Sequence, residues 1–91
     1  MARVRFTSHL TRFFPTLTQD IPISGTTIAD IVTQLETQFP GMQSYLVDER
    51  GRLRKHVNIF VNGEMVRDKE QLGDAVTDAT QVFILQALSG G

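Results

Sequence analysis

The residues best suited to chemistry are the last two of the sequence, Gly90 and Gly91. Without side chains they form a slender end, which can enter a narrow active site and adopt backbone angles closed to other residues. The carboxylate of Gly91 is the reactive group that such an end would present to a partner enzyme. The pair therefore predicts a carrier whose C-terminus is chemically activated. A loose terminus of small residues, or a remnant of an expression vector, would also account for the pair.

Other reactive groups are scarce in the sequence. It has no cysteine, which excludes disulfides, thiolate nucleophiles and Cys-ligated zinc or iron–sulfur clusters. His9 and His56 lie far apart without paired carboxylates, so we expect no metal site. The glycines are dispersed as turn residues, not gathered into a phosphate-binding loop. An Asp-Ser pair, the attachment context for a phosphopantetheine arm, does not occur, which counts against an acyl carrier. We expect no bound cofactor.

Length and charge limit the function classes further. The 91 residues, 41% of them hydrophobic, predict one domain over 1–91 with a single core and little space for a buried catalytic cavity. The net charge of −1 gives no field that favours nucleic acid or an anionic membrane. The sequence has no long apolar run and no signal peptide at its start, and it lacks disulfides. We expect a cytoplasmic protein that is monomeric when free.

The N-terminal part predicts two strands that could hold this end. Ala2–Ser8 alternates apolar and polar residues, as a half-buried strand does. Leu17–Ile23 has an imperfect apolar row and contains Pro22, which suits an edge strand.

A helix follows the second strand. Thr27 is a plausible N-cap, with Asp30 favourable to the positive helix end. One apolar stripe comes next, formed by Ile28, Ile31, Val32, Leu35 and Phe39. Pro40-Gly41 predicts the helix end. Residues 42–53 are predicted to be irregular, with Tyr45, Leu46 and Val47 tucked under the domain.

The C-terminal part predicts three more strands. Lys55–Asn62 is the clearest, and Asn62-Gly63 is typical of a type I′ hairpin turn that returns through Glu64–Val66. Residues 69–76 read as a loop or short helical turn around Leu72. Gln81–Ala87 is the last strand.

This order of elements predicts the α+β class and the β-grasp arrangement. The mixed sheet would have four to five strands, with one main helix packed across one face. The last strand would lie centrally beside the first and project a flexible tail, residues 88–91, from the end of the sheet.

The C-terminal half carries a resemblance to a known family. Val57-Asn-Ile-Phe-Val-Asn-Gly63, Val66-Arg67, Leu72, Val82-Phe-Ile-Leu85 and Ala87-Leu-Ser-Gly-Gly91 resemble the MoaD/ThiS sulfur carriers, which are ubiquitin-like β-grasp proteins. The connection Tyr45–Lys55 is longer than in the smallest thiamin-type carriers. With the Ala-Leu-Ser-Gly-Gly ending, it is more similar to the CysO type, which feeds a cysteine synthase. The molybdopterin type is a close second.

The resemblance implies a role without catalysis by the chain itself. An E1-like enzyme would use ATP to adenylate the carboxylate of Gly91, and a sulfur donor would convert it to a thiocarboxylate. A downstream synthase would then take the sulfur. Leu88, Ser89 and Gly90 would thread the partner's site. The alternatives are a ubiquitin-like modifier that forms isopeptide bonds to lysine, and a plain β-grasp binding module with an idle tail.

Two surface features go beyond what the fold requires. Phe60, Phe83 and Leu85 are out of phase with the buried rows of their strands, so they predict an exposed apolar patch for partner docking. Alternatively, residues 42–53 fold over them. Arg50, Arg52, Arg54 and Lys55 form a basic run that could bind phosphates or an acidic surface. Because Asp48 and Glu49 adjoin it, we expect a solvated loop.

Overall fold

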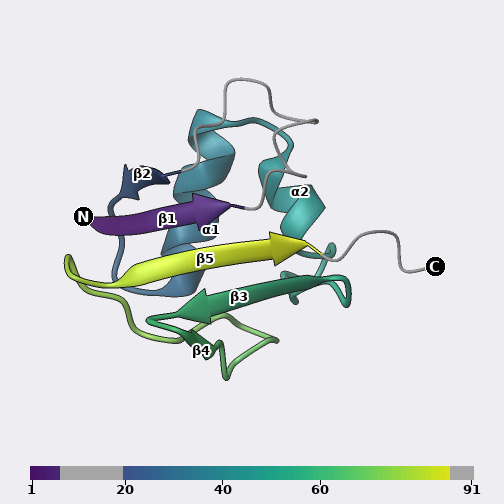
Figure 1. Cartoon of the computed structure of the whole chain (residues 1–91). Coiled ribbons are helices and arrows are strands. Elements are labelled where there is room, and N and C mark those ends of the chain that lie inside the picture. Colours follow the sequence, from purple (N-terminus) through teal and green to yellow (C-terminus); the bar gives the residue numbers. More distant parts are fainter. Residues whose placement is uncertain (7–19, 87–91) are drawn as a thin grey trace.

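The computed structural model describes residues 1–6 and 20–86, which form one five-stranded sheet with both helices on a single face (Figure 1). The strands are β1 (Ala2–Phe6), β2 (Asp20–Ile23), β3 (Val57–Val61), β4 (Glu64–Met65) and β5 (Gln81–Gln86), and the helices are α1 (Ile28–Gln38) and α2 (Met42–Leu46). The strand order is β2-β1-β5-β3-β4. β1 and β5 are parallel and the other pairs are antiparallel, so the predicted mixed sheet with a central last strand is confirmed.

The core lies between the sheet and the two helices. Strand residues in alternate positions, such as Val4, Ile59 and Ile84, are fully buried against the helices. The predicted stripe of α1 faces them, with Ile31 and Leu35 at its centre. The alternation in the strands and the 3.6-residue period in the helix thus meet in one apolar layer.

The start of α1 is capped as predicted. The Thr27 hydroxyl oxygen accepts a hydrogen bond from the Asp30 backbone N–H at 3.2 Å. In return, the Asp30 carboxylate accepts from both the backbone N–H and the hydroxyl of Thr26, each at 2.9 Å. These bonds, first that from the Thr26 N–H, lower the pKa of Asp30. The exchange satisfies donors that the first helical turn leaves free.

The prediction that residues 42–53 are irregular is wrong for its first part, because Met42–Leu46 forms α2. Gly41 has a φ of 99°, which lets the chain reverse after α1. The Glu36 carboxylate then accepts from the backbone N–H groups of Gly41 and Gln43, the latter at 2.8 Å. α2 therefore begins on an acceptor from the preceding helix, not on a local cap. Met42 and Leu46, one turn apart, are both fully buried.

Two strands are shorter than predicted. β3 begins at Val57, and Lys55 and His56 lie in the turn before it. β4 contains Glu64 and Met65 without Val66, which is buried. The predictions for Thr7, Ser8, Leu17 and Ala87 lie outside the described residues.

Candidate functional site

The predicted reactive end, Leu88, Ser89, Gly90 and Gly91, lies outside the described residues. The structure does place the strand that leads to it. β5 is the central strand, bonded to β1 on one side and to β3 on the other. Its last residue, Gln86, pairs with Val57 at the start of β3 (Figure 1). The chain therefore continues to residues 87–91 from the middle of the sheet.

The Asn62-Gly63 turn ties the β3–β4 hairpin to the beginning of β5. Asn62 and Gly63 both have positive φ, 51° and 86°, as the predicted type I′ turn requires. The Asn62 side-chain oxygen accepts from the backbone N–H of Gln81 at 2.8 Å, and the Asn62 N–H donates to the Gln81 carbonyl at 2.8 Å. The hairpin is thereby held in register with the central strand.

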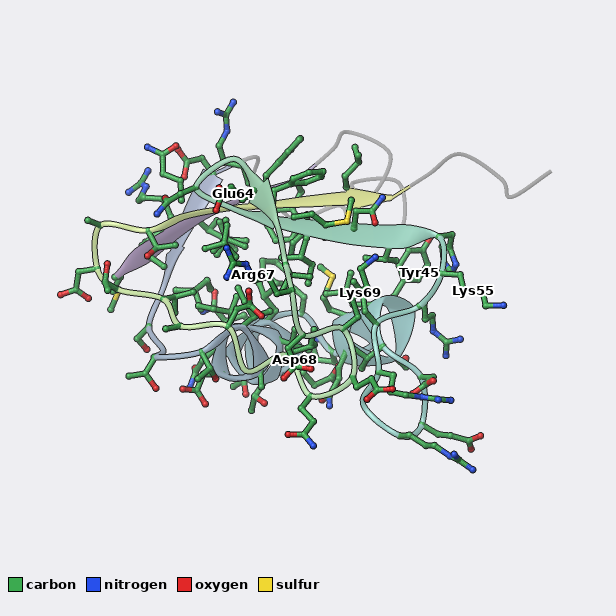
Figure 2. The ribbon with its side chains drawn as sticks, turned by 90° about the horizontal axis from the view of Figure 1, so that it is seen from below. Tyr45, Lys55, Glu64, Arg67, Asp68 and Lys69 are labelled. Atoms are coloured by element: carbon green, nitrogen blue, oxygen red, sulfur yellow. The ribbon has the colours of Figure 1, made fainter. Side chains whose placement is uncertain are left out.

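The apolar patch of Phe60, Phe83 and Leu85 lies on the sheet face opposite the helices, which we call the open face. Phe60 and Phe83 are direct cross-strand partners. Val82 and Ile84, on either side of Phe83, are buried, whereas the Phe83 side chain is 39% exposed. Seen from below, both helices lie on the other side of the sheet (Figure 2). The three side chains line a surface depression of about 830 Å³.

Residues 42–53 do not line this depression, so the alternative that they cover the patch is wrong. They contribute α2, which packs against α1 on the other side of the sheet. Within the described parts of the chain, the patch faces outward.

The structure adds residues to the open face that the sequence analysis missed. Met65 is the partner of Phe60 across the hairpin, and its side chain is 44% exposed. On the other side, Arg5 is the partner of Phe83, and Asp20 is the partner of Arg5. One row across the sheet thus changes from apolar to charged. The two-residue turn Asn62-Gly63 fixes the pairing of Phe60 with Met65. The position of Met65 on the open face could therefore have been predicted from the register of the hairpin.

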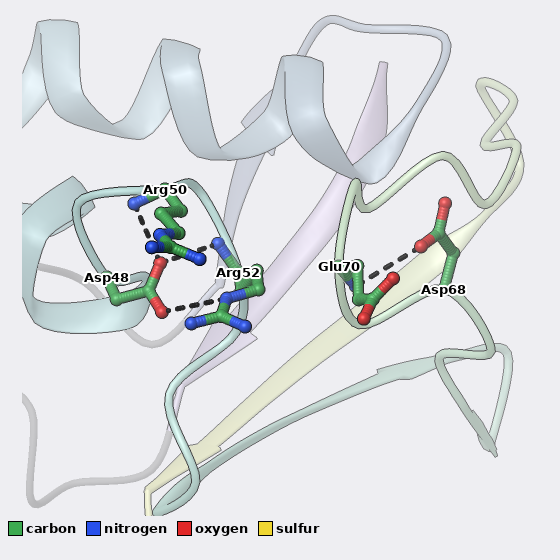
Figure 3. Close-up of polar contacts among 5 residues, drawn as sticks. All are labelled: Asp48, Arg50, Arg52, Asp68 and Glu70. Atoms are coloured by element: carbon green, nitrogen blue, oxygen red, sulfur yellow. Dashed lines mark hydrogen bonds and ion pairs between the residues drawn. The ribbon is translucent and has the colours of Figure 1, made fainter.

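The basic run lies in a connection that one carboxylate organises. Asp48 accepts from the backbone N–H groups of Arg50 and Arg52, both at 2.9 Å, and pairs with the Arg52 Nε at 3.2 Å (Figure 3). These contacts, first the Arg52 N–H, lower the pKa of Asp48. Arg50, Arg52, Arg54 and Lys55 are all exposed.

A second carboxylate organises the connection between β4 and β5. Asp68 accepts from the backbone N–H groups of Glu70, Gln71 and Gly73, which lowers its pKa, first through the bond from Gln71 (Figure 3). The predicted turn around Leu72 is present, and Leu72 is buried at a φ of 56°. Both connections therefore have a fixed backbone.

Residues 1–6 and 20–86 contain no cluster of three or more His, Cys, Asp or Glu side chains that could hold a metal ion. In the same residues no helix is long and apolar enough to cross a membrane. Of the two histidines, His56 is half-buried beside β3 and His9 lies outside the described residues.

Comparison with known proteins decides the family. The model of the ThiS family matches residues 4–91. The chain belongs to the ThiS family. The predicted membership of the MoaD/ThiS group is confirmed, and so is the ubiquitin-like β-grasp fold. A chain in the crystal structure of the BexX/CysO complex of Amycolatopsis orientalis superposes on this ThiS-family chain with a TM-score of 0.85. Its identity is 27%, and the match covers 100% of both chains.

Two curated relatives have names that bear on function. Sulfur carrier protein CysO of Mycobacterium tuberculosis is 36% identical over 75 residues, which are 80% of this ThiS-family chain and 81% of CysO. Small archaeal modifier protein 3 of Haloferax volcanii is 28% identical over 65 residues, which are 71% of this chain and 70% of that protein.

Proposed function

We propose that this ThiS-family protein is a sulfur carrier and a co-substrate of its partner enzymes, and that it performs no catalysis itself. Its family and its likeness to a protein named as the sulfur carrier CysO support this. The structural observation that carries the proposal is the central position of β5, from whose end the chain continues to Gly91. A strand bonded on both sides gives a firm base to an end that must be presented to another protein.

The chemistry that we propose takes place at the carboxylate of Gly91. A carboxylate oxygen attacks the α-phosphorus of ATP in an E1-like enzyme, and pyrophosphate leaves. A donor at the oxidation level of hydrosulfide then attacks the acyl carbon, and AMP leaves. The product is a thiocarboxylate, a nucleophile that a downstream synthase can use. ATP is bound by the activating partner, and this chain holds no cofactor.

The open face is the surface that we propose for docking these partners. Phe60, Phe83 and Leu85 form an outward apolar patch, and such patches mark interaction surfaces. Arg5 and Met65 extend it on either side. The occurrence of a similar chain in the BexX/CysO complex supports the expectation of a protein partner.

Mass spectrometry of the intact protein tests the proposal. The purified chain is incubated with ATP, a ThiS-type activating enzyme and a sulfide source. We expect a mass increase that equals one exchange of oxygen for sulfur, and fragmentation should place it on Gly91. A chain that stays unmodified with every activating enzyme of its own organism would refute the carrier function.

A second candidate function is that of a ubiquitin-like protein modifier. The likeness to small archaeal modifier protein 3 favours it. Activation would be the same, but a lysine amine would attack the activated carbonyl and form an isopeptide bond. Conjugates of higher mass that survive reducing gels would indicate the modifier. If the protein is a sulfur carrier, its likeness to CysO favours cysteine biosynthesis over molybdopterin biosynthesis as the pathway that receives the sulfur.

A further inference from the structure

A second hollow, of about 430 Å³, lies between the connection after α2 and the connection from β4 to β5. We call it the basic hollow, because the charged side chains that line it are Arg52, Arg54, Lys55 and Lys69 against Asp48 and Glu70. Its composition differs from that of the depression on the open face, where Arg5 is the one charged residue among the described residues of the lining and Phe60, Phe83 and Leu85 are apolar.

A backbone hydrogen bond brings the two connections together. The Leu53 N–H donates to the Lys69 carbonyl at 2.8 Å. Leu53 also forms an isolated β-bridge with Val47, and its side chain packs against the core. Lys69 is thereby fixed beside the basic run, to which it does not belong in the sequence. Lys55 and Lys69, both labelled in Figure 2, come from these two connections and line the same hollow.

The cations of the hollow are only partly neutralised. Asp48 pairs with Arg52, so these two charges offset each other. The Arg54 Nε donates to the Ser44 carbonyl at 2.9 Å, which holds Arg54 in place but leaves its charge. Lys55 and Lys69 are exposed, and neither forms an ion pair with another described residue. Among the described residues that line the hollow, Glu70 is therefore the one remaining negative charge beside the three exposed cations Arg54, Lys55 and Lys69.

The position of the hollow links it to the reactive end. Lys55 and His56 directly precede Val57, which pairs with Gln86 at the end of β5. The hollow thus lies at the end of the sheet from which the chain continues to residues 87–91. Five fully extended residues span about 17 Å at most. A protein that encloses Gly91 must then approach this end of the sheet closely.

We infer that the basic hollow docks an acidic side-chain cluster on the protein that receives the C-terminal residues. This inference rests on the proposed carrier function and names the chemistry of its partner. Separate cations interspersed with carboxylates suit pairing with Asp and Glu on a protein surface. The overall charge of −1 disfavours a polyanion such as nucleic acid. Charges at the rim of an interface chiefly raise the association rate and fix the orientation of docking.

An NMR titration of the full, ¹⁵N-labelled chain tests the inference with a defined probe, the peptide hexaglutamate. We expect saturable shifts of the amides of Lys55, His56, Lys69 and Glu70. The double substitution Lys55→Gln and Lys69→Gln should weaken binding about threefold to tenfold, as expected for two exposed ion pairs. About 0.5 M salt, where the Debye length is only a few ångströms, should abolish binding.

The matched control is the double substitution Arg50→Gln and Arg67→Gln. It removes the same charge from two exposed residues that do not line the hollow. Binding that falls equally in the control, or shifts that spread evenly over the surface, would overturn the inference. So would displacement of the peptide by inorganic phosphate at equal concentration, since that outcome indicates a small-anion site. Thiocarboxylate formation is measured separately, so a failed carrier function and a failed basic hollow give different results.

Discussion

At the scale of single residues, a methyl group at the Cα of residue 90 is the smallest change that tests the reactive end. Gly90→Ala should fold normally, because it changes none of the residues that form the buried core. It should slow the ATP–pyrophosphate exchange catalysed by the activating enzyme. The methyl group restricts the backbone angles of residue 90 and takes up space in the active-site channel of that enzyme. Displacement of a reacting group by about 1 Å can cost on the order of a hundredfold in rate.

An added residue after Gly91 gives the companion test. It displaces the carboxylate, so we expect exchange to stop. Exchange at the wild-type rate without prior trimming would show that the carboxylate of Gly91 is not the reactive group.

Phe60→Asp tests the open face. The aspartate should weaken binding to the activating enzyme by more than about 2 kcal/mol, as truncated interface aromatics commonly do. Its fold should persist, because Phe60 points away from the helices. Gln34→Glu, on the exposed side of α1, adds the same charge on the opposite face and serves as the control in calorimetry. Equal affinities for the wild type and both variants would remove the apolar patch from the docking surface.

At the scale of elements, two adjacent residues of β5 have different roles: Ile84 contributes to stability and Phe83 to the proposed docking surface. Ile84 is fully buried and Phe83 is 39% exposed. Ile84→Ala should lower the free energy of unfolding by about 2–5 kcal/mol, because it opens a cavity in the core. Phe83→Ala should cost about 1 kcal/mol or less, mainly through the lost pair with Phe60. Urea unfolding of both variants measures the difference, and a reversed order would mean that the faces of β5 are exchanged.

The two carboxylate-centred connections make stability depend on acid. Backbone N–H donors lower the pKa values of Asp48 and Asp68 in the folded state, as they do for Glu36. Their stabilising effect is complete above the unfolded pKa values of about 4, and is lost as the pH falls through the lower folded values. Urea midpoints should stay level from about pH 7 to pH 5 and decline below about pH 4. Asp48→Asn should make the decline of the urea midpoint below about pH 4 less steep, because it removes one of the titrating carboxylates. A midpoint that rises on acidification would contradict this assignment.

Local patterns predicted most of these elements, and distant contacts account for the rest. The alternation in β1, β3 and β5 and the stripe of α1 state which face is buried, so the apolar patch could be predicted from strand phase. α2 could not, because its first N–H groups are held by Glu36 from the preceding helix. The basic hollow depends on the bond from Leu53 to Lys69, between residues that no local pattern relates.

At the scale of the whole molecule, the fold and the reactive end should be separable. Deleting Gly90 and Gly91 should leave the melting temperature nearly unchanged, since the deletion removes none of the buried core residues and none of the described pairings of β5. The same deletion should abolish adenylation. Differential scanning calorimetry and pyrophosphate exchange measure the two effects on one sample. A large drop in melting temperature would assign a structural role to the end.

The central place of β5 also has a consequence for synthesis on the ribosome. β1 emerges first, yet its parallel neighbour is made about 80 residues later, at Gln81–Gln86, and such distant pairing slows folding. At about 5–20 residues per second, β1 waits for several seconds with one edge unpaired. The sheet closes only after β5 has been translated. A partner enzyme that recognises the closed sheet would thus not bind chains whose synthesis has not reached β5.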